Sequence, residues 1–265
     1  VNNKPPDGSI VITITGDEEG EAVDGTVAIL DWMQQNGEKI DHCLVGEPTS
    51  PSQMGEMMKI GRRGSMNAKI TATGTQGHSA YPDRANNPIV AMVKLLDKLE
   101  SHQLDVGTEH FDPSTLAITS VDTGNKASNV IPAVTKATIN IRFNDSHSGS
   151  SLVSWLKDEI EKVSAEYGIK FKTDFKISGE SFITPPGELS DLISKAVKQE
   201  LGVTPKLSTT GGTSDARFIK DMCPVTEFGL VGKTMHAVDE KVETKQINQL
   251  KEIYTRILEA YFEKT

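Results

Sequence analysis

The segment Ile10-Val-Ile-Thr-Ile-Thr-Gly-Asp-Glu-Glu-Gly20 constrains the fold more than any other part of the chain. Its apolar run predicts a strand, and the strand leads into a glycine-bounded loop with two adjacent carboxylates, Glu18 and Glu19. In open α/β sheets, ligands bind beyond the carboxyl ends of the strands. Neighbouring side chains on an extended backbone point in different directions, so one carboxylate can hold a divalent metal while the other faces the water that the metal activates. The pair predicts a metal ligand beside a general base.

A solvated acidic loop that caps the next helix is the alternative interpretation of Glu18 and Glu19, because carboxylates near a helix N-terminus complement its dipole. A second expected strand end, Asp41-His-Cys-Leu-Val-Gly-Glu-Pro-Thr49, places another carboxylate, Glu47, after an apolar run and a glycine. Carboxylates at two strand ends favour a metal centre over a capped helix.

Composition limits the class of protein. The chain has 265 residues, 36% of them apolar, which is enough for one large domain or two smaller ones. A formal charge of −9 with scattered Lys and Arg argues against a nucleic-acid or membrane partner and favours a small-molecule substrate. Two cysteines without metal-type spacing, no long apolar run and no signal peptide predict a cytoplasmic protein. Because the first residue is Val1 and a core-type strand follows closely, we expect a fragment of a longer protein.

Hydrophobic patterns predict two domains. Strand, helix and strand patterns over residues 10–45 indicate a βαβ unit and therefore an α/β domain with a mainly parallel sheet. From about Gly64 the order becomes strand, helix, strand, strand, helix, strand, at residues 65–73, 88–99, 114–121, 134–143, 151–167 and 169–177. This order predicts a split βαβ domain, an antiparallel sheet with two helices on one face. The chain then rejoins the first domain, with expected helices at 189–201 and 243–262 and expected strands near 206 and at 224–228. We therefore expect a catalytic domain over 1–63 and 179–265, with an inserted domain over 64–178.

Two histidines lie in polar loops. His236 precedes the last expected helix and is available as an imidazole ligand to zinc, although a lone loop histidine is more often a surface residue. Glu19 and Glu47, at strand ends of the same sheet, favour the ligand interpretation. His78 belongs to the inserted domain, so it can reach the site only through domain closure or from a partner subunit. There it could donate a hydrogen bond to a developing oxyanion.

Other polar residues are candidates for holding a substrate carboxylate. Arg62 lies at the expected domain junction, where a guanidinium can form paired hydrogen bonds with a carboxylate. Arg142 interrupts an apolar alternation, and Asn129 precedes Val-Ile-Pro; a structural hydrogen bond is the alternative for each. The stretch Gly211-Gly-Thr-Ser-Asp-Ala-Arg-Phe218 predicts a helix N-terminus that either cradles a carboxylate or forms an ordinary cap.

Six short motifs, in this order, resemble the zinc-dependent amidohydrolases of the M20 metallopeptidase family: Gly16-Asp-Glu-Glu-Gly20, Gly46-Glu-Pro-Thr49, Gly61-Arg-Arg-Gly-Ser65, Gly77-His-Ser-Ala-Tyr-Pro82, Asn129-Val-Ile-Pro132 and Gly211-Gly-Thr-Ser-Asp215. The resemblance covers essentially the whole chain. It implies a zinc-exopeptidase-like α/β catalytic domain interrupted by a dimerisation domain, a homodimer, and two zinc ions with cobalt as a substitute. It is strongest to members that hydrolyse N-succinyl-LL-2,6-diaminopimelate to succinate and LL-2,6-diaminopimelate in lysine biosynthesis.

The resemblance also implies roles for individual residues. Glu18 matches the general base, and Glu19, Glu47 and His236 match metal ligands. His78 matches a histidine that the partner subunit contributes to the active site. The positions expected around the substrate carboxylates are Arg62, Tyr81, Asn129, Arg142, Gly212 and Thr213.

One departure from the family bears on activity. The family's N-terminal segment of about 120 residues, with a His-x-Asp motif and a metal-bridging aspartate, is absent from this sequence, and a catalytic zinc normally needs three protein ligands. We therefore expect this chain alone to bind metal weakly and to be inactive. The alternatives are acetylornithine deacetylase or another N-acyl amino-acid deacylase of the family, and a noncatalytic dimerisation module. Arg62, Asn129 and Arg142 favour a dicarboxylic acyl group, and the intact Glu18–Glu19 pair argues against a noncatalytic module.

Overall fold

The computed structural model describes residues 8–20 and 22–263, which form two compact units. The first unit combines Val1–Arg62 with Ile183–Thr265, and the second is Arg63–Phe182. The sequence-based expectation places the divisions at 63/64 and 178/179. Each unit has its own hydrophobic core. The short strands β3 (Gly61–Arg62) and β10 (Phe182–Ile183) lie where the chain passes from one unit to the other.

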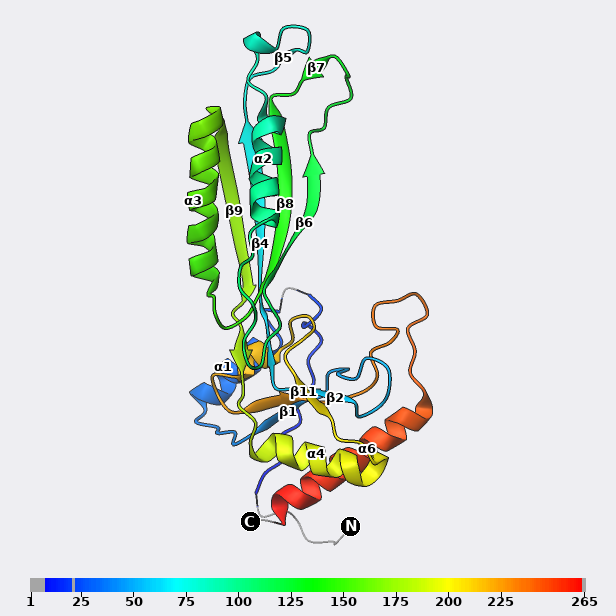
Figure 1. Ribbon diagram of the computed structural model, residues 1–265. Coiled ribbons are helices and arrows are strands. Elements are labelled where there is room, and N and C mark those ends of the chain that lie inside the picture. Colours follow the sequence, from blue (N-terminus) through cyan, green and yellow to red (C-terminus); the bar gives the residue numbers. More distant parts are fainter. Residues whose placement is uncertain (1–7, 21, 264–265) are drawn as a thin grey trace. The chain divides into compact units, whose positions relative to one another are not determined.

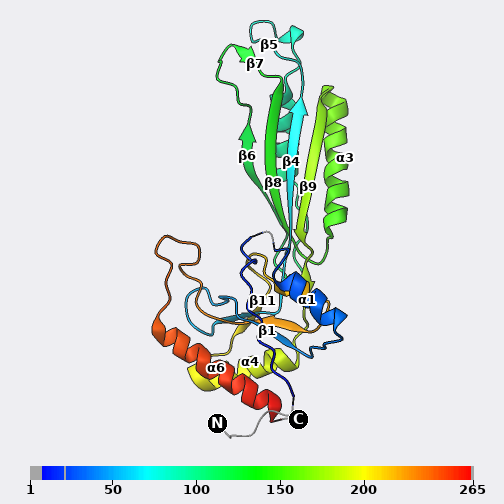
Figure 2. The same cartoon turned by 180° about the vertical axis from the view of Figure 1, so that it is seen from behind.

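The second unit has the predicted split βαβ order. Its sheet has the strand order β6-β8-β4-β9, with every neighbouring pair antiparallel. Two helices cover one face of this sheet (Figure 1), and the other face is seen in Figure 2. The elements are β4 (Gly64–Thr73), α2 (Pro88–Glu100), β6 (Thr115–Asp122), β8 (Val134–Phe143), α3 (Gly149–Tyr167) and β9 (Lys170–Gly179).

Local sequence explains these boundaries. On β8, Ile139, Ile141 and Phe143 alternate with polar residues and are fully buried in the core. α2 begins with Pro88 after Asn87, whose side chain accepts a hydrogen bond from the Ile89 amide at 3.0 Å. α3 ends at Tyr167 and is capped by Gly168, whose φ of 61° suits a glycine just after a helix.

A small two-stranded sheet lies beyond the end of the main sheet where Thr73 pairs with Val134 (Figure 1). It consists of β5 (Gly77–His78) and β7 (Val130–Ile131), which pair antiparallel. The 3-10 helix η1 (Pro82–Arg84) follows β5. This end of the second unit therefore carries the Gly77–Pro82 and Asn129–Pro132 motifs.

The first unit contains a four-stranded sheet in the order β1-β12-β2-β11. The pairs β1/β12 and β11/β2 are parallel, as expected, and β12/β2 is antiparallel, so the sheet is mixed. α4 and α6 cover one face, and α1 and α5 lie on the other side (Figures 1 and 2). The elements are α1 (Thr26–Gln35), β1 (Cys43–Val45), β2 (Met57–Lys59), α4 (Glu188–Leu201), β11 (Lys206–Ser208), α5 (Ala216–Ile219), β12 (Val225–Glu227) and α6 (Thr244–Phe262).

The strand expected at Ile10–Thr15 is wrong. These residues form no strand, and the side chains of Ile12 and Ile14 are 81% and 89% exposed. A β-branched run becomes a strand only when a neighbouring strand accepts its backbone hydrogen bonds and covers its side chains, and no ladder among the described residues includes this run. The first βαβ unit is therefore not formed, and β1 pairs with β12 instead.

Both cysteines are free. Cys43 is half-buried and Cys223 is buried. Burial raises the pKa of the Cys43 thiol to about 12, so this thiol stays protonated and unreactive near neutral pH. Over the residues with described structure, none of the helices has the length and apolar character required to span a bilayer.

Candidate active site

Asp17 organises the loop that presents the paired carboxylates. Its Oδ2 accepts hydrogen bonds from the backbone amides of Val23 at 2.6 Å and Asp24 at 2.8 Å, and its carbonyl oxygen accepts one from the Gly20 amide at 3.0 Å. The Asp24 amide is the main cause that lowers the pKa of Asp17, so this carboxylate stays ionised and holds the loop closed. Sequence reasoning missed this role. An Asp directly before the carboxylate pair, in a glycine-bounded loop, was the available signal.

Glu19 and His236 come together although they are far apart in the sequence. The His236 Nε2 atom lies 3.6 Å from the Glu19 Oε1 atom, and both side chains are mostly exposed. His236 has a φ of +60°, and its amide donates a hydrogen bond to Glu240 Oε2 at 3.2 Å. Two ligands of a tetrahedral zinc, with bonds of about 2.0–2.1 Å, lie roughly 3.3 Å apart. The pair therefore has a spacing close to that of two ligands of one metal ion.

Glu18 and Glu47 carry raised pKa values. Burial raises the pKa of Glu18, and the charges of Glu19 and Asp215 add to this effect. Burial also raises the pKa of Glu47, to about 7, with further contributions from Glu227 and Glu18. Carboxylates that repel one another in a partly desolvated place are stabilised in their ionised form by a bound cation.

The described residues do not complete a metal shell. Glu19 and His236 can supply two ligands and Glu47 a nearby negative charge. However, no group of three His, Cys, Asp or Glu side chains among the described residues is placed to hold a metal ion. Since a catalytic zinc normally has three protein ligands, the donor set seen here fits such a metal only in part.

The backbone around Glu47 is fixed by the loop that follows β12. The Phe228 amide donates to the Val45 carbonyl at 3.0 Å, and the Gly229 amide donates to Thr49 Oγ1 at 3.2 Å. A Cβ atom on Gly229 would collide with the Glu47 carbonyl oxygen, so only glycine allows this approach. The close contact between the two loops positions Glu47.

Arg62 is held by a protein carboxylate. Its Nε lies 2.9 Å from Glu227 Oε1, its Nη2 also contacts Glu227, and its Nη1 donates to the Gly212 carbonyl at 3.2 Å. Glu227 Oε1 also accepts a hydrogen bond from Ser214 Oγ at 2.7 Å. Sequence reasoning missed Glu227 and Ser214. The available signal was a carboxylate inside the otherwise core-type strand that ends at Phe228. Gly212 and Thr213, both predicted site residues, lie on the loop that this network holds.

Three of the predicted residues in the second unit gather around β5 and β7. His78 pairs with Val130, the Ser79 amide donates to the Asn129 carbonyl at 3.0 Å, and the rings of His78 and Tyr81 are 5.9 Å apart. The Ala80 amide donates to His78 Nδ1 at 3.0 Å, which assigns the ring proton to Nε2. His78 is exposed and can therefore act as a hydrogen-bond donor.

Arg142 lies on β8 of the four-stranded sheet, at the end away from β5 and β7. It pairs with Ser65, whereas Val134, at the end near β5 and β7, is eight residues away along β8, or roughly 25 Å. Its Nε donates to Asn140 Oδ1 at 3.1 Å, and both residues belong to the polar face of the strand. The expectation that Arg142 interrupts the alternation is wrong, because the buried residues Ile139, Ile141 and Phe143 alternate with it.

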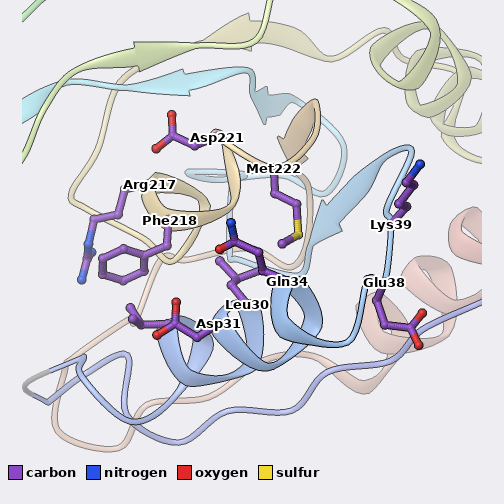
Figure 3. A pocket seen from close by; sticks show the side chains of 11 residues that line it. Leu30, Asp31, Gln34, Glu38, Lys39, Arg217, Phe218, Asp221 and Met222 are labelled. Atoms are coloured by element: carbon purple, nitrogen blue, oxygen red, sulfur yellow. The ribbon is translucent and has the colours of Figure 1, made fainter.

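A separate hollow of about 590 Å³ in the first unit contains none of the predicted site residues. Leu30 and Asp31 of α1 line it on one side, and Arg217 and Phe218 of α5 on the other (Figure 3). The Arg217 guanidinium carbon lies 4.4 Å from the centre of the Phe218 ring. The candidate site is therefore defined by the carboxylate loop, not by this hollow.

Comparisons with known proteins agree with the observed fold. A model of the "Peptidase dimerisation domain" matches residues 60–168. The succinyl-diaminopimelate desuccinylase of Cereibacter sphaeroides is 65% identical over 262 residues, which cover 99% of this chain and 69% of that protein. The enzyme of the same name from Ruegeria pomeroyi is 63% identical, with the same coverage.

Solved structures share the fold at low sequence identity. Aminopeptidase PepT from Bacillus cereus superposes with a TM-score of 0.75 at 16% identity, covering 93% of this chain and 62% of that one. The dipeptidase Dug1p from Saccharomyces cerevisiae gives 0.68 at 16% identity, covering 94% and 64%. The two sequence relatives and the dimerisation-domain match show that the chain belongs to the succinyl-diaminopimelate desuccinylases of the M20 family.

Proposed function

We propose that this chain carries the base and part of the metal site of an enzyme that converts N-succinyl-LL-2,6-diaminopimelate and water to succinate and LL-2,6-diaminopimelate. The observation that carries the proposal is the short distance, 3.6 Å, between His236 Nε2 and Glu19 Oε1, next in sequence to Glu18. The chain is also 65% identical to a succinyl-diaminopimelate desuccinylase. Glu19, Glu47 and His236 are the proposed metal ligands, with zinc as the metal and cobalt as a substitute.

Glu18 is the proposed general base. It takes a proton from water while the water oxygen attacks the carbonyl carbon of the succinyl amide. The tetrahedral carbon then collapses, the C–N bond breaks, and Glu18 returns the proton to the leaving amine. Its half-buried position on the loop closed by Asp17 supports this role, because a base must be held in a fixed direction.

The remaining proposed contacts come from the second unit and, for Gly212 and Thr213, from the first. His78 donates Nε2–H to the developing oxyanion, and Tyr81, Asn129, Arg142, Gly212 and Thr213 contact the substrate carboxylates. Arg142 lies roughly 25 Å along β8 from Val134, which marks the end of the main sheet near β5 and β7, and this separation supports a division of these roles between two copies of the chain. In a homodimer, His78 of one copy would serve the site of the other.

The edge strand β6 is the proposed dimer contact. Edge strands are usually protected by charged residues, and the opposite edge, β9, carries Lys170, Lys172 and Lys176. β6 has no lysine or arginine and exposes Val121 at its edge. The only charged residue of β6 is Asp122 at its end, so β6 is the less protected edge and the one suited to pair with a second copy.

Val121→Lys is expected to weaken the dimer about tenfold or more, because two copies would bring like charges together across the paired edges. Light scattering should then report a mass near 28.8 kDa in place of twice that value at low micromolar concentration. Ile177→Lys, on the exposed part of β9, is the matched control and should leave the dimer intact. A dimer that survives Val121→Lys but not Ile177→Lys would place the contact on β9.

The activity is tested by release of LL-2,6-diaminopimelate from its N-succinyl derivative in the presence of zinc. Two proteins are compared: this chain, and an extended form in which the N-terminal segment of the Cereibacter sphaeroides relative precedes it. Activity is expected only in the extended form, since three ligands are normally needed for catalytic zinc. Hydrolysis of N-acetylornithine in preference to the succinyl compound would identify a sister deacylase instead. Full turnover by the chain alone would contradict the expected need for further ligands.

A further inference from the structure

We infer that Glu227 is a positioning residue that fixes the Gly211–Ser214 loop. This inference rests on the proposed function only where Gly212 and Thr213 are taken as substrate contacts. Glu227 belongs to the core strand β12, and it is 2% exposed. A carboxylate buried to this degree must find strong partners, and both of its oxygen atoms have them.

The carboxylate joins two different segments. Its Oε1 accepts hydrogen bonds from Ser214 Oγ at 2.7 Å and from Arg62 Nε at 2.9 Å, and its Oε2 accepts from Arg62 Nε at 3.1 Å and from Nη2. Ser214 is fully buried, and Arg62 is 7% exposed. Glu227 therefore holds the loop directly, through Ser214, and also fixes the guanidinium of Arg62.

Arg62 in turn holds the other end of the loop. Its Nη1 donates to the Gly212 carbonyl oxygen at 3.2 Å. Gly211 has a φ of +108°, and a Cβ atom there would lie 2.5 Å from Arg62 Nη1. The guanidinium thus packs against Gly211 in a space that only glycine leaves open. Thr213 lies between these two anchors, one at Gly212 and one at Ser214.

Burial makes the arrangement sensitive to the loss of one charge. Hydrogen bonds between charged groups are stronger than neutral ones, and removing one partner of a buried pair leaves the other uncompensated. With a neutral residue at position 227, Arg62 would turn toward other acceptors and release the Gly212 carbonyl. If the pair served only the stability of the fold, its loss would lower the global stability of the first unit and would have no selective effect on this loop.

Amide hydrogen exchange on the 265-residue chain separates these possibilities. In Glu227→Gln, residues 211–214 should exchange at least about tenfold faster, while β4 in the second unit keeps its protection. The matched control is Glu200→Gln, which removes an ion pair to Arg256 at 3.0 Å between α4 and α6 of the same unit. The inference is overturned if exchange at 211–214 is unchanged, or if it rises equally with the rest of the first unit and equally in Glu200→Gln.

Kinetics of the extended form give the second readout. Glu227→Gln should raise KM for the succinyl substrate about tenfold with kcat changed less than about threefold, since a loosened binding loop weakens binding before chemistry. Glu227→Asp should recover part of the loss. An active extended form whose KM is unaffected by Glu227→Gln would overturn the link to substrate binding. An inactive extended form with the native Glu227 would instead contradict the proposed function, and the exchange experiment would still decide the positioning role.

Discussion

Replacement of Glu18 by glutamine in the extended form is expected to lower kcat about 10³-fold. Glutamine keeps the size of the side chain and can still accept a hydrogen bond, but it cannot take a proton from the attacking water. Glu18 is partly desolvated and lies beside Glu19 and Asp215, and these neighbours raise its pKa. The measurement is the steady-state rate of succinate release, together with the metal content per subunit.

The metal content separates the proposed roles of the two adjacent carboxylates. Glu18→Gln should retain the metal, whereas Glu19→Ala should lose it, because Glu19 faces His236 at 3.6 Å and Glu18 does not. Asp24→Asn is a suitable control: it neutralises an exposed carboxylate of the same loop but leaves the amide that binds Asp17. A Glu18→Gln enzyme with nearly native kcat would remove Glu18 from the role of base.

The second unit was predictable because its signals are local. β4, α2 and β8 each bury one face, so the period of apolar residues reveals the type of element and its ends to within a residue or two. The Ile10–Thr15 run shows the same pattern and yet forms no strand. Whether a β-branched run becomes a strand depends on a partner elsewhere, and the run itself carries no information about that partner.

The same distinction holds for the candidate site. Glu18, Glu19, Glu47 and His236 could be selected because each follows an apolar run or a glycine in a short motif. The groups that position the site could not be found in this way. Glu227 acts on Arg62 across 165 residues of sequence, and the role of Gly229 depends on the approach of the Gly46–Glu47 backbone. The sequence gives no sign that the Arg62 side chain has a partner within the protein. In the structure it is held by the Glu227 carboxylate and the Gly212 carbonyl oxygen.

Gly229→Ala is expected to lower the free energy of unfolding of the chain by about 2–4 kcal/mol. The new Cβ would overlap the carbonyl oxygens of Gly46 and Glu47, which are backbone atoms and cannot turn aside as a flexible side chain can. To relieve the overlap, the loop after β12 must separate from the loop after β1. This movement would weaken the hydrogen bonds from Gly229 to Thr49 and from Phe228 to Val45. Urea unfolding of the purified chain measures the loss.

Gly232→Ala is the matched control, because a Cβ at Gly232 meets Pro48 at 3.5 Å, an ordinary contact, and should change the free energy of unfolding by less than about 1 kcal/mol. In the extended form, Gly229→Ala should also reduce metal retention, since the displaced backbone carries the Glu47 carboxylate away from Glu18 and Glu19. Gly232→Ala leaves that backbone in place. If the two variants unfold at the same urea concentration, the close approach at Gly229 is not what holds Glu47, and the β1/β12 pairing alone must position it.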